Sequence, residues 1–62
     1  MNKKDYVQFA EMIAEKVGYA KDEDPPYDLE TIKSVAFGMC GIFSRDNYNF
    51  DRSRFLAACN LE

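Results

Sequence analysis

The chain has 62 residues with two cysteines and no histidine, and its net charge at neutral pH is −3. Without histidine, catalysis by a Ser–His or Cys–His pair is excluded, and a structural zinc lacks the roughly four Cys or His ligands that it needs. So short a chain forms one domain, and it buries only about 60% of the surface that its unfolded form exposes.

The first apolar pattern predicts a helix over residues 3–17. Asn2 is a suitable N-cap, and Asp5 places negative charge in the first turn, where the helix dipole favours it. Gly18 is expected to end the helix, because glycine enters the left-handed cap conformation without a steric penalty. Apolar side chains recur along one face at three- and four-residue spacing: Tyr6, Phe9, Ala10, Ile13 and Val17.

Residues 19–27 are predicted to be a connection, because Pro25 and Pro26 cannot continue a helix and favour an extended stretch. Tyr19 and Tyr27 flank it. We expect both rings to fold back over the edge of the core, and the alternative is an exposed acidic–aromatic contact loop. The acids in the connection do not match a calcium-binding loop, and we interpret them as a solvated charged run: Asp22, Glu23 and Asp24.

A second helix is predicted over residues 28–45, with Asp28 as its N-cap and Glu30 in its first turn. Its second half is apolar almost all round, and such a helix is usually buried on several sides. A single short chain cannot easily provide that cover, so we expect a homodimer. The apolar stripe contains Leu29, Ile32, Val35, Ala36, Met39 and Phe43, and it is widened by Phe37, Cys40 and Ile42.

Gly38 and Gly41 lie inside this helix, where each glycine costs about 1 kcal/mol relative to alanine. We favour close approach of another helix, within the chain or across the dimer, and the alternative is a kink near Gly38. The run Gly38-Met39-Cys40-Gly41 follows no strand and has no lysine, so it is not a nucleotide motif. The candidate dimer-packing residues are Gly38, Gly41, Phe37 and Ile42.

A third helix is predicted over residues 51–59, after a run of turn formers at residues 46–49. Asp51 is its expected N-cap. Phe50 precedes the cap and Phe55 follows it by four residues, which is the pattern of a hydrophobic staple.

The expected fold class is therefore an all-α three-helix unit formed by residues 1–60. We interpret Leu61-Glu62 as the remnant of a cloning site. Cys40 and Cys59 lie among apolar residues, so we expect buried free thiols rather than a disulfide, which favours a reducing setting. No apolar run is long enough for a signal peptide or a membrane span, and we expect a cytoplasmic protein.

The charge is uneven along the chain. Residues 1–30 hold four lysines against eight acids, giving −4, whereas residues 31–62 hold four cations against three acids, giving +1. We expect Arg52 or Arg54 to pair with an acid: Asp46, Asp51 or the 22–24 run. The alternative is an arginine patch, with Tyr48 and Asn47, that faces a partner.

A helix–turn–helix interpretation places Arg52 and Arg54 at the start of a recognition helix. The short third helix and the acidic net charge argue against it, because phosphate contacts dominate affinity for DNA. We therefore do not expect a nucleic-acid partner.

The segment from Asp46 to Cys59, together with the opening Met1–Tyr6, resembles a group of small phage- and prophage-encoded proteins of unassigned function. Those proteins tend to close on Phe-Asp-Arg-x-Arg-Phe-x-x-Ala-Cys-Gly, and residues 50–59 here read Phe-Asp-Arg-Ser-Arg-Phe-Leu-Ala-Ala-Cys. Asn60 stands where the group has glycine, and the Pro25-Pro26 spacer is not a feature of the group. The resemblance implies an origin in a bacterial virus or mobile element and action in the host cytoplasm.

We expect a non-enzymatic protein without metal or cofactor that binds a host or phage protein, with inhibition of a bacterial defence system such as CRISPR–Cas as the leading form. The alternatives are a small DNA-binding regulator that uses the three arginines and a phage structural or assembly accessory. The candidate partner-binding residues are Arg45, Tyr48, Arg52, Arg54, Asp22, Glu23 and Asp24.

Overall fold

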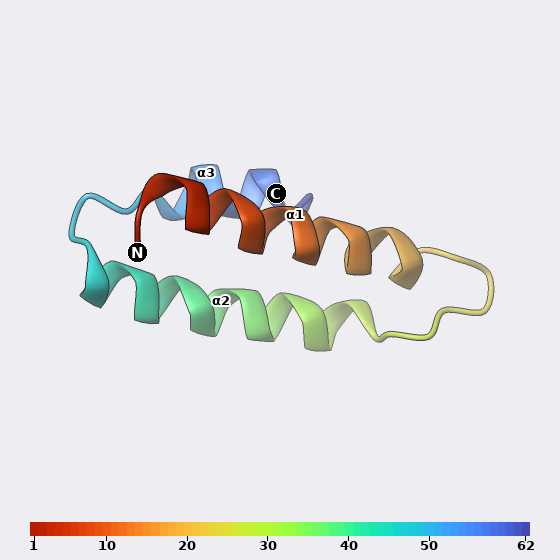
Figure 1. The fold of residues 1–62 in the computed structure, drawn as a ribbon. Coiled ribbons are helices and arrows are strands. Elements are labelled where there is room, and N and C mark those ends of the chain that lie inside the picture. Colours follow the sequence, from red (N-terminus) through yellow and green to blue (C-terminus); the bar gives the residue numbers. More distant parts are fainter.

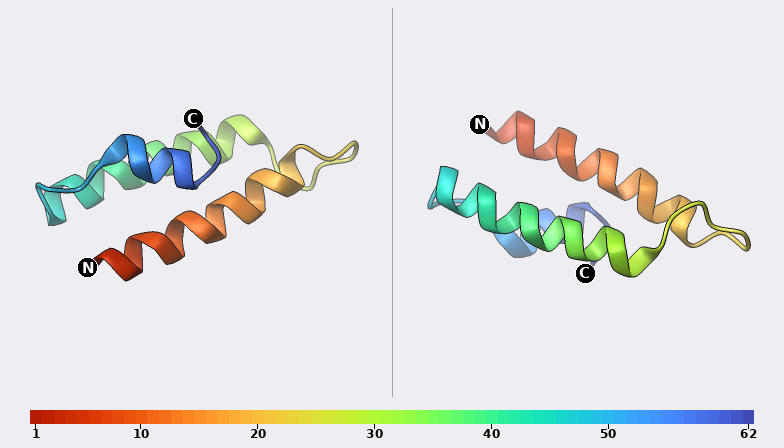
Figure 2. Two further views of the ribbon diagram at one scale, coloured as in Figure 1. Left: turned by 90° about the horizontal axis from the view of Figure 1, so that it is seen from above. Right: turned by 90° about the horizontal axis from the view of Figure 1, so that it is seen from below.

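The computed structural model describes residues 1–62 as three helices without a strand: α1 (Lys3–Ala20), α2 (Leu29–Asp46) and α3 (Arg52–Ala58). The all-α three-helix unit predicted from the sequence is confirmed. α1 and α2 run antiparallel, and the short α3 packs along one side of this pair (Figures 1 and 2). The molecule measures 38 × 18 × 16 Å, with the 21–28 connection at one end and the N-terminus and 47–51 turn at the other (Figure 1).

Each helix begins at the N-cap that the sequence predicts. Asn2 forms a capping box, in which its side chain accepts from the Asp5 N–H at 3.1 Å and the Asp5 carboxylate accepts from the Asn2 N–H at 2.9 Å. Asp28 accepts from the Thr31 N–H and, at 2.7 Å, from the Thr31 hydroxyl. Asp51 accepts a backbone N–H in the first turn of α3 at 3.0 Å. These local bonds explain why the predicted helix starts agree with the structure.

The expected end of the first helix at Gly18 is wrong. α1 continues to Ala20, and no glycine in the chain has a positive φ. Glycine permits the left-handed conformation but does not require it, so Gly18 remains helical.

The left-handed position lies instead at Asn60, where φ is 65°. After it, the Leu61 N–H donates to the Leu56 carbonyl at 3.0 Å, which closes α3 in the manner of a Schellman motif. Leu61 also packs against the core. Leu61, which follows α3, therefore packs back against the helices.

The core contains nine buried residues, all of them apolar or cysteine. Phe43 lies at its centre, and its ring centroid is 5.0–5.5 Å from the centroids of four other aromatic rings. The predicted staple is confirmed, with Phe50 and Phe55 5.5 Å apart. The buried residues come from all three helices and the residue after α3: Ala10, Ile13, Val17, Ala36, Cys40, Phe43, Phe55, Leu56 and Cys59.

α2 is less covered by its own chain than its composition suggests. Val35, expected in the apolar stripe, is 58% exposed, and Ile42 is 55% exposed. The helix runs unbroken through Gly38 and Gly41, so the alternative of a break near Gly38 is wrong. A Cβ added at either glycine meets no atom within 4 Å, which rules out close approach of another helix within the chain.

Tyr19, in the last turn of α1, and Tyr27, in the connection, do not cover the core. Tyr19 and Tyr27 are both exposed, and their rings pack against each other at 6.3 Å. The expectation that they fold back over the core edge is therefore wrong, and the Tyr27 hydroxyl instead accepts from the Lys16 ammonium at 3.5 Å.

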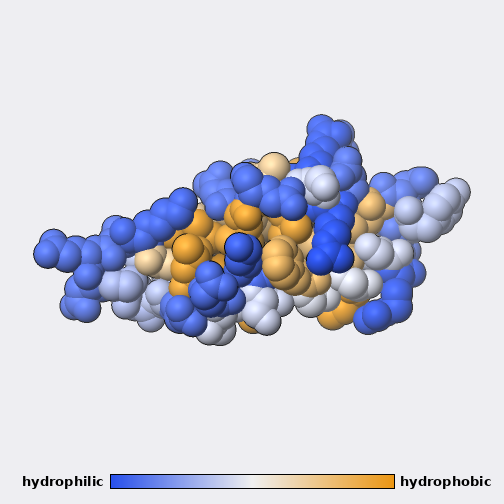
Figure 3. Space-filling view, turned by 180° about the vertical axis from the view of Figure 1, so that it is seen from behind, coloured by the Kyte–Doolittle hydropathy of each residue, from blue (hydrophilic) through white to orange (hydrophobic).

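Both cysteines are free and buried, as the sequence predicts. None of the three helices is long and apolar enough to cross a lipid bilayer. Seen from behind, the molecule is apolar in its middle, between α2 and α3, and hydrophilic side chains project at both ends (Figure 3).

Candidate functional site

A groove of about 380 Å³ opens between the start of α1 and α3, beside the turn that joins α2 to α3. Polar side chains from this turn and from both helices also line it, including Asn49, Asp51, Lys3 and Arg54. Its apolar lining comes from Val7, Ala10, Phe50, Phe55 and Ala58. The groove therefore combines an apolar surface with hydrogen-bonding and charged groups.

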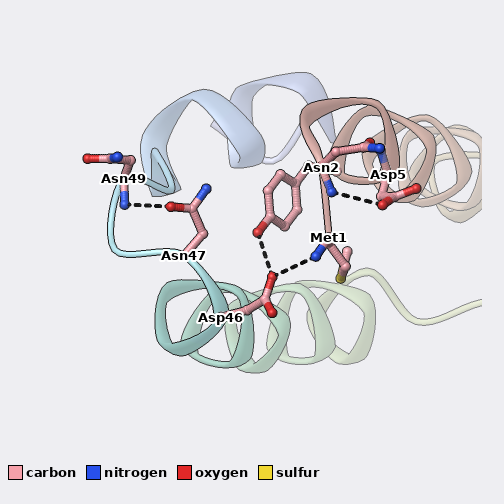
Figure 4. Close-up of polar contacts among 7 residues, drawn as sticks. Met1, Asn2, Asp5, Asp46, Asn47 and Asn49 are labelled. Carbon is pink, nitrogen blue, oxygen red and sulfur yellow. Dashed lines mark hydrogen bonds and ion pairs between the residues drawn. The ribbon is translucent and has the colours of Figure 1, made fainter.

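Asp46 joins the end of α2 to the start of α1 beside this groove (Figure 4). Its carboxylate accepts from the Met1 amine and from the Tyr6 hydroxyl, each at 3.1 Å. These two donors, the amine first, hold the pKa of Asp46 below its ordinary value. The pKa of Tyr6 is raised, chiefly because partial burial removes water from its hydroxyl and then because the Asp46 carboxylate lies beside it. The contact fixes Tyr6, which lines the groove, against α2.

The turn is also held by local bonds. The Asn47 side chain accepts from the Asn49 N–H at 3.0 Å, which shapes the turn as an Asx motif (Figure 4). Three carboxylates near the groove already accept hydrogen bonds from the chain itself: Asp5, Asp46 and Asp51.

The cations beside the groove have no such partners. Only two ion pairs occur in the chain, between the Met1 amine and Asp46 and between Lys16 and Glu15. The expected pairing of Arg52 or Arg54 with an acid is therefore wrong. Lys3 and Arg54 line the groove without a carboxylate within ion-pair distance.

The structure separates the three arginines. The Arg52 guanidinium lies 5.4 Å from the centroid of the Phe37 ring of α2, whereas Arg54 faces the groove beside α1. Residues two apart on a helix point to different sides, so Arg52 and Arg54 do not form one surface. Arg45 is exposed in the last turn of α2 and does not line the groove.

The other predicted partner-binding residues also lie outside the groove. Tyr48 is 91% exposed at the turn, outside the groove lining. The acids of the 22–24 run lie in the connection at the opposite end of the molecule (Figure 1). Of the predicted set, only Arg54 belongs to the groove.

Sequence reasoning missed Lys3 and Tyr6 as site residues. The staple of Phe50 and Phe55 was the sequence pattern closest to them. It predicts that the start of α3 packs on an apolar surface, but it does not identify the helix that provides this surface.

The predicted dimer-packing residues do not lie on one surface either. Phe37 lies against Arg52 of α3, whereas Ile42 is 55% exposed.

Neither cysteine is a reactive nucleophile at neutral pH. Burial, and then the neighbouring Cys40, raise the pKa of the Cys59 thiol to about 11. Burial also raises the pKa of Cys40. Both thiols hold their protons at pH 7, and a thiol rather than a thiolate is a poor nucleophile.

Nowhere do three or more Cys, Asp or Glu side chains gather in a way that could hold a metal ion. No family model, curated protein or solved structure matches the chain. Function is therefore inferred from the geometry and charge of the groove.

Proposed function

We propose that the chain is a non-enzymatic interaction module that binds an acidic segment of a partner protein in the groove between α1 and α3. One observation carries this proposal: the groove pairs an apolar lining with two cations, Lys3 and Arg54, that have no ion-pair partner in the chain. An apolar side chain of the partner displaces water from the lining, and carboxylates beside it pair with the cations.

The local charge supports an acidic rather than a basic partner. The carboxylates of Asp5, Asp46 and Asp51 are occupied by the chain's own donors, so they are poorly placed to bind a cationic ligand. The guanidinium of Arg54 offers a planar set of donors that matches a carboxylate. A volume of about 380 Å³ also leaves room for an aromatic anchor on the partner.

The resemblance of residues 46–59 to small phage and prophage proteins favours a partner in a bacterial host. We propose that the chain binds and blocks a host defence protein such as a CRISPR–Cas effector. Blockade needs only the occupation of a surface, which suits a chain of 62 residues.

The first experiment measures binding of a labelled peptide with one aromatic residue flanked by Asp and Glu, by fluorescence anisotropy. We expect binding that weakens as salt is added, because exposed charge pairs are screened. Arg54→Glu should weaken binding by at least about tenfold, because it places like charges together. Lys21→Glu makes the same charge change at the other end of the molecule and should leave binding nearly unchanged. Equal losses in both variants would show that only net charge matters.

The second experiment identifies the partner. Wild-type chain and Arg54→Glu serve as baits in a lysate of the bacterial host, and a specific partner is retained by the first and lost by the second. A plasmid-interference assay in a strain with active CRISPR–Cas then tests blockade, and we expect wild-type chain to relieve interference. Retention of the same proteins by both baits would place the binding surface elsewhere.

A titration with random duplex DNA at low salt tests the regulator alternative. We expect no binding, because Arg52 and Arg54 lie on different sides of α3 and the chain is acidic overall. Tight binding that Arg54→Glu abolishes would replace the protein-binding proposal with a nucleic-acid one.

A further inference from the structure

α3 covers one side of the antiparallel α1–α2 pair and leaves another side without a partner. On α2, Phe37 marks the side towards α3, because its ring lies against Arg52. Asp46 marks a different side, towards α1, because it accepts from Tyr6. Counting back from Asp46 at helical spacing of four, three and four residues places three apolar residues on this second side: Ile42, Met39 and Val35.

α1 contributes to the same surface. The Phe9 ring packs 5.5 Å from Phe43 of α2, and Met12 follows Phe9 by three residues on the same side of the helix. Val7 lies on another side, where it lines the groove beside α3. Because the helices are antiparallel with Phe9 beside Phe43, Met12 lies level with Met39.

We call the surface formed by Phe9, Met12, Val35, Met39 and Ile42 the open face. Four of these side chains are 39–58% exposed, and Met39 is half-buried. On α2 the open face is uncharged, because residues 34–44 contain no Asp, Glu, Lys or Arg. Exposed apolar side chains gathered on one side of two neighbouring helices are typical of an interaction surface.

We propose that a second copy of the chain covers the open face in a two-fold symmetric dimer. The pairing brings α1 and α2 of both copies together as a four-helix arrangement, with each α3 on the outside. The small core favours this occupant, because only nine of 62 residues are buried and a chain of this size gains stability from further burial.

The size of the face fits a weak dimer. Four of its five residues are 39–58% exposed, so the open face presents roughly 400–500 Å² per copy, and two copies together bury less than ~1,200 Å², which is the range of weak, transient interfaces.

Charge also favours self-association at this place. The chain carries −3 overall, and two copies repel each other across most surfaces. The uncharged run of residues 34–44 gives α2 a contact surface where that repulsion is least. The groove beside α3 is lined by other residues, so it stays accessible in the dimer and this proposal does not rest on the groove's function.

Sedimentation equilibrium from low micromolar to millimolar concentration tests the proposal. We expect the mass of the wild-type chain to rise from 7.2 kDa towards twice that value. Ile42→Lys places a charge on the open face and should remain at the monomer mass. Val7→Lys is the matched control, because Val7 is 46% exposed on another side of α1, and it should still dimerise.

Circular dichroism of each variant reports whether it is folded. If Ile42→Lys loses helicity, Val35→Lys decides the question, because Val35 is 58% exposed and its replacement removes little core packing. A wild-type mass of 7.2 kDa at every concentration would overturn the dimer, and so would equal dimerisation of the open-face variants and Val7→Lys.

Discussion

The covered side of the α1–α2 pair and the open face have similar side chains in different surroundings. On the covered side, Ile13, Cys40 and Phe43 are 0–4% exposed because α3 packs over them. On the open face, Val35 and Ile42 are more than half exposed. Side-chain type alone therefore does not decide which apolar residues of this chain are buried.

The difference follows from the length of α3. With seven residues, α3 covers one side of two helices that each have 18 residues, and apolar side chains on the second side stay exposed. The chain thus carries more apolar surface on its long helices than it can bury alone. Part of this excess lies on the open face, where a second copy can bury it.

The largest expected effect is a core truncation on the covered side. Phe43→Ala removes the ring that contacts four others and should lower the free energy of unfolding by about 3–5 kcal/mol, enough to unfold a marginal domain. Urea denaturation followed by circular dichroism measures it. Val35→Ala, measured at concentrations where the chain is monomeric, should change stability by only about 0.5 kcal/mol or less. Similar losses in both variants would contradict the difference between the two sides.

A smaller effect is expected where α3 is closed. Asn60 has a φ of 65°, and a residue with a Cβ pays about 1–2 kcal/mol in the left-handed helical conformation. Asn60→Ala should therefore destabilise the chain by about 1 kcal/mol, since asparagine tolerates the conformation better than alanine. Asn60→Gly should be neutral or stabilising in the same thermal unfolding experiment. Equal destabilisation by both would mean that the Asn60 side chain, not its backbone conformation, closes the helix.

The two glycines of α2 give a further test of the difference between the covered side and the open face. Gly41→Ala should raise the free energy of unfolding by about 0.5–1 kcal/mol, because alanine is the better helix former and an added Cβ meets no atom within 4 Å. Gly38 borders the open face between Val35 and Ile42. In the dimer an added Cβ at this position therefore meets the second copy, and the gain in unfolding free energy from Gly38→Ala should be smaller. Equal gains in the two variants at dimeric concentrations would place Gly38 outside the contact.

The smallest effect concerns acid. The core has no buried charged residue, so the response to low pH comes from the carboxylates whose pKa is lowered in the fold, Asp28 at the cap of α2 and Asp46 at the contact with α1. The Thr31 hydroxyl, and more weakly the backbone N–H groups, hold the pKa of Asp28 below its ordinary value of 3.8. A lowered folded pKa gives stability that is present above pH 3.8 and is lost as the pH falls through the folded pKa.

Asp28→Asn keeps a good N-cap but removes the titration, so its unfolding free energy should fall less steeply below pH 4 than that of wild type. Chemical denaturation at a series of pH values measures both slopes. Identical slopes would show that Asp28 contributes nothing to acid sensitivity.

The helix starts could be predicted because N-capping is local. Asn2, Asp28 and Asp51 each bond to a backbone N–H three residues further along, and residues so close in sequence need no tertiary information. The staple of Phe50 and Phe55 was predictable for the same reason. The end of α1 was not, because a glycine permits two conformations and the sequence does not say which one it adopts.

The candidate site depended on tertiary contacts that local patterns do not specify. Arg54 was a predicted partner-binding residue, but its neighbour in the groove, Lys3, comes from the opposite end of the sequence. The expected patch failed because Arg52 and Arg54 point to different sides of one short helix. The excess of apolar side chains on α2 was visible in the sequence, whereas the side left uncovered depended on where α3 packs.

The most direct test of the open face is an isotope-filtered NOE experiment on a mixture of ¹³C-labelled and unlabelled chains. Signals that pass from one copy to the other report only contacts between copies. We predict intermolecular NOEs from the methyl groups of Met12, Met39 and Ile42, and none from Val7 beside the groove. Intermolecular NOEs from Val7, or their absence from all three open-face methyl groups in a concentrated sample, would contradict the account.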